Sequence, residues 1–211
     1  IVSGGGDITI KPGISGTAAG QNNTKEDVII NAGSGDINLD YAGGVVIGGG
    51  DIGKVQLDAA TINLSEGITS SATDSAGNAA VVDINGAVVL KGDVGITSNG
   101  ANIDFNTTIV SDTTPRNLTI ESGSGSVTIG GNIAGAATND LAAIDINATG
   151  STATGNITLS GNIGASGESG ATTVKIGNAA TNKLTLSGAF YSSTGANTYT
   201  CLLYTSPSPR D

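Results

Sequence analysis

The sequence predicts an all-β fold, a parallel β-solenoid of about seven coils. Three observations support this fold class. Short runs alternate apolar and polar residues, clusters rich in Gly, Ser, Asn and Asp separate these runs, and the same strand-and-turn phrase keeps returning along the chain. A β-sandwich would not keep returning to one phrase, so the repeat favours a solenoid.

The alternating runs place one polar residue between two apolar ones, which is the period of a strand with one buried face. The apolar positions are mostly Ile, Val and Leu, whose side chains suit a pleated, half-buried surface. We therefore expect these residues to point inward and the intervening Thr, Asn and Asp to face solvent. The nine runs are Ile8–Ile10, Ile37–Leu39, Ile62–Leu64, Ile103–Phe105, Leu118–Ile120, Val127–Ile129, Ile144–Ile146, Ile157–Leu159 and Leu184–Leu186.

Turns are expected between the strands, for example at 33–36 and 123–126, where Gly can take positive φ and Asn or Asp can bond its own backbone. No segment repeats apolar residues at helical spacing over three turns, and Gly is too frequent for helix interiors. The segment from Ala134 to Ala143 is the one place where we expect a turn or two of helix.

Self-alignment gives the length of a coil. Gly131–Gly135 and Gly161–Ala165 share one phrase, and the strands that begin at Val127 and Ile157 lie at the same separation. The run that begins at Leu184 follows at a slightly shorter step. A coil therefore takes about 25–30 residues, as in other solenoid repeats. At about 4.8 Å per coil, such a stack forms a rod of roughly 35 Å.

These phrases resemble the repeats of filamentous-haemagglutinin-like and autotransporter-like bacterial surface proteins. The likeness is carried by NLTIESGSGSVTIGGNIAG at 117–135 and GNITLSGNIG at 155–164, and it covers most of residues 6–188. It implies a right-handed parallel β-helix within a very long secreted protein that serves as a stalk or adhesive fibre. It brings no catalytic motif with it.

Composition excludes several classes of function. Eight Lys and Arg against 18 Asp and Glu give a net charge of −10, which repels nucleic acid and anionic membranes. His is absent and Cys201 is the single Cys, so His or Cys zinc sites and the Ser/His/Asp triad are excluded. No apolar stretch approaches the roughly 18–20 residues of a membrane helix.

Both ends of the sequence bear on its domain organisation. The chain begins at Ile1 and contains no Met, so we expect an internal fragment of a longer protein, with a single solenoid segment over 1–200. The last eleven residues, CLLYTSPSPRD, resemble the conceptual translation of a transposase sequencing-library adapter. We therefore expect residues 201–211 to be a non-native tail, to leave the solenoid, and to support no argument from Cys201.

Two glycine motifs suggest ligand binding at first sight. Gly48, Gly50 and Gly53 form a GxGxxG pattern, but a dinucleotide site needs a helix next, and Lys54–Leu57 alternates like a strand. Gly4–Asp7 and Gly48–Asp51 are similar to calcium-binding β-roll turns, although they lack the nonapeptide repeat. We expect solenoid corners at both places and no cofactor, while calcium at turn Asp residues stays open.

The residue types in the sequence give little support for a catalytic function. A polysaccharide-degrading β-helix needs converging carboxylates, a cation and aromatic platforms, whereas Trp is absent and Arg116 is the one Arg before the tail. An ice-binding face would need two Thr per strand, but the outward Thr occur singly, at Thr9, Thr119, Thr128, Thr158 and Thr185. We expect no catalytic, cofactor or metal residues.

The expected function is a non-catalytic structural or adhesive stalk segment of a large secreted bacterial surface protein, located outside the cell. Its expected partners are host or environmental glycans or surface proteins, and coils that end unpaired would associate end to end. Two alternatives stay open: a carbohydrate-active β-helix whose catalytic coils lie outside these residues, and a passive surface-layer or matrix repeat.

Overall fold

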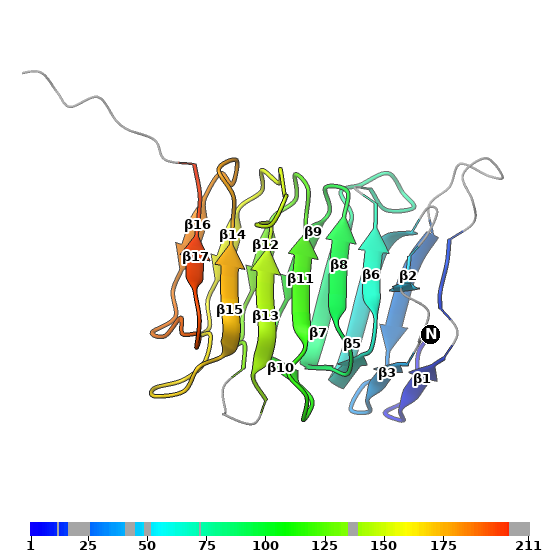
Figure 1. The fold of residues 1–211 in the computed structure, drawn as a ribbon. Helices are drawn as coiled ribbons and strands as arrows, with labels where there is room; N and C mark the ends of the chain where they lie inside the picture. Colours follow the sequence, from blue (N-terminus) through cyan, green and yellow to red (C-terminus); the bar gives the residue numbers. More distant parts are fainter. Residues whose placement is uncertain are drawn as a thin grey trace, which may run out of the picture.

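The computed structural model describes residues 1–11, 13–16, 26–40, 45–48, 52–71, 73–134 and 139–202. For residues 45 and 46 it describes the backbone alone. The chain forms a parallel β-solenoid of about 6 turns, as the sequence predicts, with slightly fewer turns than the seven expected (Figure 1). All nine alternating runs are strands or lie within one.

The strands stack in three parallel ladders around one core. The first and second ladders belong to one sheet, because β5 and β7 run through both of them. The first ladder consists of β2 (Glu26–Asn31), β5 (Ile52–Leu64), β7 (Val81–Leu90), β9 (Asn102–Phe105), β12 (Val127–Ile129), β14 (Ile157–Leu159) and β16 (Leu184–Leu186).

The second ladder contains β1 (Ile8–Ile10), β3 (Ile37–Leu39), the second half of β5, the second half of β7, and β10 (Ile109–Ser111). Single bridges at Ile133, Ile163 and Tyr191 continue it. The third ladder is a separate seven-stranded sheet, whose strands lie side by side in Figure 1. It consists of β4 (Val45–Ile47), β6 (Gly67–Ser70), β8 (Val94–Ser98), β11 (Asn117–Glu121), β13 (Leu141–Ile146), β15 (Ala171–Ile176) and β17 (Asn197–Tyr199).

The strand register follows the sequence self-alignment. Val127 pairs with Ile157, and Ile157 pairs with Leu184, as the repeated phrases predict. The coils vary more in length than expected, because the step from Val82 to its partner Ile103 is much shorter than these two. Short connections at 91–93 and 99–101, on either side of β8 (Val94–Ser98), account for this compact coil.

The core is one continuous apolar cluster along the solenoid axis. Ile120, Ile129 and Leu159 are buried as predicted, with relative exposures of 0–1 %. Leu186 is a correction: it was expected to be buried but is 37 % exposed. It lies on β16, the last strand of the first ladder within the described residues, so no following coil covers it there.

A second correction concerns Ala134–Ala143, where a turn or two of helix was expected. Ala134 takes a positive φ of 45°, and Leu141–Ala143 begin β13. Residues 135–138 of this segment lie outside the described residues. No residue that the structure describes belongs to an α-helix.

Turns occupy 33–35 and 123–125 as predicted, and they stack tightly on the coils beside them. Gly123 has a φ of +60°, which favours glycine. At Gly155 the reason is close approach, since a Cβ there would lie 1.7 Å from the carbonyl oxygen of Gly125. Glycine at such corners therefore allows successive coils to come into contact.

The corner between the third and first ladders carries buried polar side chains. The hydroxyl of Ser98 donates to the carbonyls of Ala101 at 2.7 Å and of Ser122 at 3.1 Å. In the next coil, Asn147 donates to the Ser122 hydroxyl and accepts from the Ser122 amide, both at 2.8 Å. These bonds satisfy backbone groups that the strand ladders leave unpaired at the bend.

The described residues end at Cys201 and Leu202, which are exposed and belong to no strand. The amide of Leu202 donates to the carbonyl of Thr181 at 2.8 Å. The rest of the adapter-like string, residues 203–211, lies outside the described residues.

Candidate functional site

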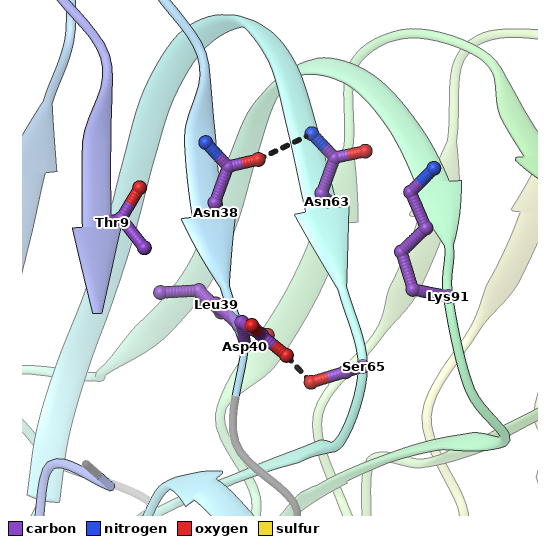
Figure 2. Close-up of a pocket in the computed structure, with 7 residues that line it drawn as sticks. All are labelled: Thr9, Asn38, Leu39, Asp40, Asn63, Ser65 and Lys91. Atoms are coloured by element: carbon purple, nitrogen blue, oxygen red, sulfur yellow. Dashed lines mark hydrogen bonds between the residues drawn. The ribbon is translucent and has the colours of Figure 1, made fainter. Parts of the chain in front are cut away.

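One concave feature among the described residues is a groove of about 420 Å³ on the second ladder, lined mostly by residues with polar side chains (Figure 2). It crosses four successive coils, on β1, β3, β5 and the residue after β7. We call it the ladder groove. It is lined by Thr9, Asn38, Leu39, Asp40, Asn63, Ser65 and Lys91.

Two asparagines form the middle of the ladder groove. Asn38 and Asn63 are register partners, and the amide nitrogen of Asn63 donates to the amide oxygen of Asn38 at 2.8 Å. Figure 2 shows that this bond leaves the nitrogen of Asn38 and the oxygen of Asn63 directed away from each other. The pair therefore presents two groups to a ligand: a donor on Asn38 and an acceptor on Asn63, which lies in the next coil.

A row of charged and polar residues runs along one side of the groove, each directly after a strand of the second ladder. The amides of Asp40, Ser65 and Lys91 donate to the carbonyls of Ile10, Leu39 and Leu64 of the preceding coils. Asp40 and Lys91 are thus two coils apart, about 10 Å at one strand spacing per coil. That distance is too long for an ion pair between Asp40 and Lys91, so the two charges do not neutralise each other.

The hydroxyl between them is already used within the protein. Ser65 donates its hydroxyl to the carbonyl of Leu39 at 2.7 Å. Among the described residues, Lys91 makes no ion pair within 4.0 Å. The opposite end of the row is Asp112, which follows β10 in the next coil.

Arg116 is not free to bind a substrate, because it pairs with Asp112. Its Nε donates to one carboxylate oxygen at 3.1 Å and its Nη2 to the other at 3.0 Å. Arg116, and to a smaller degree Lys91, hold the pKa of Asp112 below its ordinary value. Arg116, the one Arg before the tail, instead closes the loop between β10 and β11.

A second polar cluster lies on the first ladder, and we call it the acid–amide network. Asn85 donates its amide nitrogen to Asp58 at 2.8 Å and to Asp83 at 3.0 Å. Gln56 donates to the other oxygen of Asp58 at 2.8 Å. Asn106 donates to Asp83 at 3.0 Å and also to the oxygen of Asn85.

These contacts determine what the acid–amide network can do. Each oxygen of Asp58 and Asp83 accepts an amide hydrogen, so every one of these carboxylate oxygens is already bound to a neighbouring side chain. No group of three or more His, Cys, Asp or Glu among the described residues has the geometry to hold a metal ion. The network therefore links the coils of β5, β7 and β9.

Three carboxyl groups among the described residues, Asp104, Glu121 and Asp140, have raised pKa values. Burial raises the pKa of Asp104, neighbouring Asp83 raises it further, and a hydrogen bond with the Thr128 side chain offsets only part of this. Burial likewise raises the pKa of Glu121, to which Ser151 donates at 2.6 Å, and Asp145 adds to the rise. The sequence holds no sign of these carboxyl pairs, because the two members of each pair belong to different coils.

For the GxGxxG pattern, the prediction that a strand follows rather than a helix is confirmed, whereas the corner expected at Gly48–Asp51 falls mainly on residues 49–51, which lie outside the described residues. Gly53 lies within β5, so a strand and not a helix follows the GxGxxG pattern. Asp7 accepts the amide of Asp36 at 2.9 Å, which gives its carboxylate a role in coil stacking.

The outward Thr occur one per strand and face solvent, as predicted. Thr128, Thr158 and Thr185 are register partners on three successive coils, and none is buried. Thr9 lines the ladder groove, while Thr119 lines a smaller depression of about 250 Å³ with Asp93, Val94, Gly95 and Asn117.

Comparisons of the chain with family models, with curated proteins and with solved structures give no match. None of the described residues belongs to a helix long and apolar enough to cross a membrane.

Proposed function

We propose that this chain is a non-catalytic structural and adhesive segment of a large secreted bacterial surface protein. The observation that carries the proposal is the continuous stack, in which one apolar core runs along the described coils while polar side chains bond from coil to coil. Such a stack forms a stiff rod whose outer faces present polar side chains on successive coils. A stalk outside the cell needs both properties.

The ladder groove is the proposed contact surface, and its proposed ligand is a neutral glycan strand laid along the solenoid axis. Asn38 offers a donor and Asn63 an acceptor one coil apart, and Asp40 and Lys91 offer a carboxylate and an ammonium group further along. A pyranose unit in an extended glycan advances by about one coil spacing, so successive hydroxyls meet successive coils. No aromatic side chain lines the groove, so weak binding is expected for a single site.

Repetition along a rod compensates for weak individual sites, because linked sites bind with an avidity above that of one site. The net charge of −10 disfavours polyanionic glycans at the rest of the surface. We therefore propose that the ligands are neutral host or environmental glycans. The partners would be surface proteins that carry these glycans.

A glycan array probed with the full chain tests this function. Neutral linear oligosaccharides should be retained, and Asn63→Ala and Lys91→Ala should each reduce retention severalfold. Asn182→Ala is the matched control, since it removes another amide ladder, Asn182 to Asn156 at 2.9 Å, outside the groove. Equal losses in Asn63→Ala and Asn182→Ala would contradict the groove as the contact surface.

A carbohydrate-active enzyme is the second candidate, and the observation in its favour is the raised pKa of Glu121 beside Asp145. A glycosidase needs an acid with a raised pKa and a second carboxylate on either side of the scissile bond. However, neither residue lines the ladder groove or the smaller depression. Release of reducing ends from polysaccharide, abolished by Glu121→Gln, would support the enzyme over the stalk.

A passive surface-layer or matrix repeat is the third candidate. It shares the stiff rod but needs no ligand. Failure of all neutral glycans on the array, together with no polysaccharide degradation, would favour it.

A further inference from the structure

The sequence contains two Asn-Gly dipeptides, Asn85–Gly86 and Asn99–Gly100, and the structure gives them opposite surroundings. We propose that Asn99 is a site of spontaneous deamidation and isoaspartate formation, whereas the fold protects Asn85. The proposal is independent of the function of the groove.

The reaction needs no enzyme. The backbone nitrogen of the following residue attacks the side-chain carbonyl carbon of Asn, the carbon–nitrogen bond to the amide breaks, and ammonia leaves. Water then opens the resulting succinimide ring at either carbonyl, which gives an aspartyl or an isoaspartyl residue. Glycine as the following residue favours the attack, because it has no Cβ to hinder its nitrogen and its backbone turns freely.

Asn99 meets the requirements of this reaction. It is exposed and lies in the corner between β8 and β9, where Gly100 has a φ of +117°. Within the described residues, no hydrogen bond holds the side chain of Asn99, and the amide of Gly100 donates none to another backbone group. Both reacting groups are therefore free to approach each other.

Asn85 has the same sequence context but a different structural one. It lies in the middle of β7, paired with β5, and its amide nitrogen donates to Asp58 and Asp83. Its amide oxygen accepts from Asn106. The side chain must break these bonds before it can turn toward the nitrogen of Gly86, so the rate in the folded chain should be low.

Reaction at Asn99 has a structural consequence for the neighbouring coils. An isoaspartyl linkage adds one carbon to the backbone in a corner where Asn99 donates to Ser70 at 3.2 Å and Ser98 donates to Ser122. The next corner packs closely there, since a Cβ on Gly123 would lie 3.1 Å from the nitrogen of Gly100. The longer backbone should loosen the stack at this corner.

Peptide mapping of the aged full chain tests the proposal. The chain is incubated at mildly alkaline pH, in buffer and in parallel in concentrated urea, and then digested with trypsin. Cleavage after Lys54, Lys91 and Arg116 places Asn85 and Asn99 in different peptides. Fragmentation mass spectrometry locates the amide-to-acid conversion, and isoaspartyl methyltransferase labels the isoaspartyl product.

In buffer, Asn99 should react faster than Asn85 by roughly a hundredfold, because each of two hydrogen bonds to a charged partner contributes about a tenfold protection. In urea the two rates should converge, since both residues precede Gly. An Asn99→Gln variant should fold normally and lose the modification in its peptide. Folded chains in which Asn99 stays intact, or in which Asn85 reacts as fast as Asn99, would overturn the proposal.

The structural consequence has its own measurement. Aged chains separated by charge should show a lower thermal midpoint in the isoaspartyl fraction than in an Asn99→Asp variant, which carries the same charge on a normal backbone. Equal midpoints would remove the proposed effect on coil stacking.

Discussion

Single inward side chains carry much of the stability of the core, and Ile129 is a clear example. It is 1 % exposed and stacks between its register partners Phe105 and Leu159. Ile129→Ala should lower the free energy of unfolding by about 3 kcal/mol, because it removes buried methyl groups and leaves a cavity. Urea denaturation followed by circular dichroism measures this change.

The outward face of the same ladder supplies the control. Thr158 points outward, so Thr158→Ala should change the free energy of unfolding by no more than about 0.5 kcal/mol. Equal effects at Ile129 and Thr158 would mean that the inward and outward positions are assigned wrongly by one residue.

Asp104 should oppose folding at neutral pH. Burial and Asp83 raise its pKa above the ordinary value, so the folded chain takes up this proton at a higher pH than the unfolded chain does. Stability is therefore gained as the pH falls through the raised pKa, and the ionised group costs stability above it. Asp104→Asn should raise the urea midpoint at neutral pH.

The same variant should lose its advantage in acid, below the ordinary carboxyl pKa of about 3.9, where Asp104 is protonated in both states. Urea midpoints of both proteins across this pH range give the comparison. An advantage that persists unchanged in acid would show that charge is not the cause.

At the residue scale, sequence patterns predicted burial far better than polar contacts. The inward position of Ile129 follows from its alternating run alone. The bonds among Asp58, Asp83 and Asn85 depend on which coils lie side by side, and the variable coil lengths set this. The members of the ladder groove were missed for the same reason.

At the scale of elements, the corners need glycine wherever two coils approach most closely. Gly155→Ala would place a Cβ 1.7 Å from the carbonyl oxygen of Gly125, so the backbone must move. We expect a loss of about 2 kcal/mol or more in the free energy of unfolding, typical of overpacking. Gly95→Ala is the control, because nothing lies within 4 Å of its added Cβ.

Asp27 tethers the loop between β6 and β7 to the coil before it. It accepts the amide of Lys54 at 2.9 Å and the hydroxyl of Ser75 at 2.6 Å. Although burial raises the pKa of Asp27, these bonds lower it below the ordinary value overall. Its ionised form therefore stabilises the fold, and this contribution is lost as the pH falls through the lowered pKa.

Asp27→Ala should release the loop without unfolding the core. Hydrogen exchange at the amides of Lys54 and Ser75 should become faster, while exchange at the buried strand residue Ile84 stays unchanged. Acceleration throughout β7 would instead show that the loop is needed for the whole coil.

Strands were predictable at this scale because each strand carries its own alternation. The second ladder was harder to recognise, since three of its positions are single bridges, at Ile133, Ile163 and Tyr191. The prediction of a helical turn near Ala134–Ala143 was also wrong at this scale. Ala is a good helix former, but Leu141–Ala143 lie beside β11 and β15, and pairing with both neighbours outweighs that propensity.

At the scale of the whole molecule, stability is a sum over neighbouring coils, so any strand edge without a partner is a point of attachment. In the described part of the chain, β17 pairs with β15 on one side only, and Leu186 and Phe190 are exposed at the same end. Ile1 and Val2 are exposed at the other end. Among the described residues, the β17 end therefore combines an unpaired strand edge with exposed apolar side chains, and the N-terminal end exposes apolar side chains as well.

We expect the chain to associate end to end, with a sedimentation coefficient that rises with concentration. Thr200 donates its amide to Ile176 of β15, and Val174 donates to Ala196, so alternation directs the amide of Asn197 toward the open edge. Asn197→Pro removes that donor and should weaken association while circular dichroism stays unchanged. Thr198→Pro, which removes a donor on the side of β15, should instead disturb the last coil. A chain that sediments as a monomer at every concentration would show that these edges do not pair, and association that Asn197→Pro leaves intact would place the contact elsewhere.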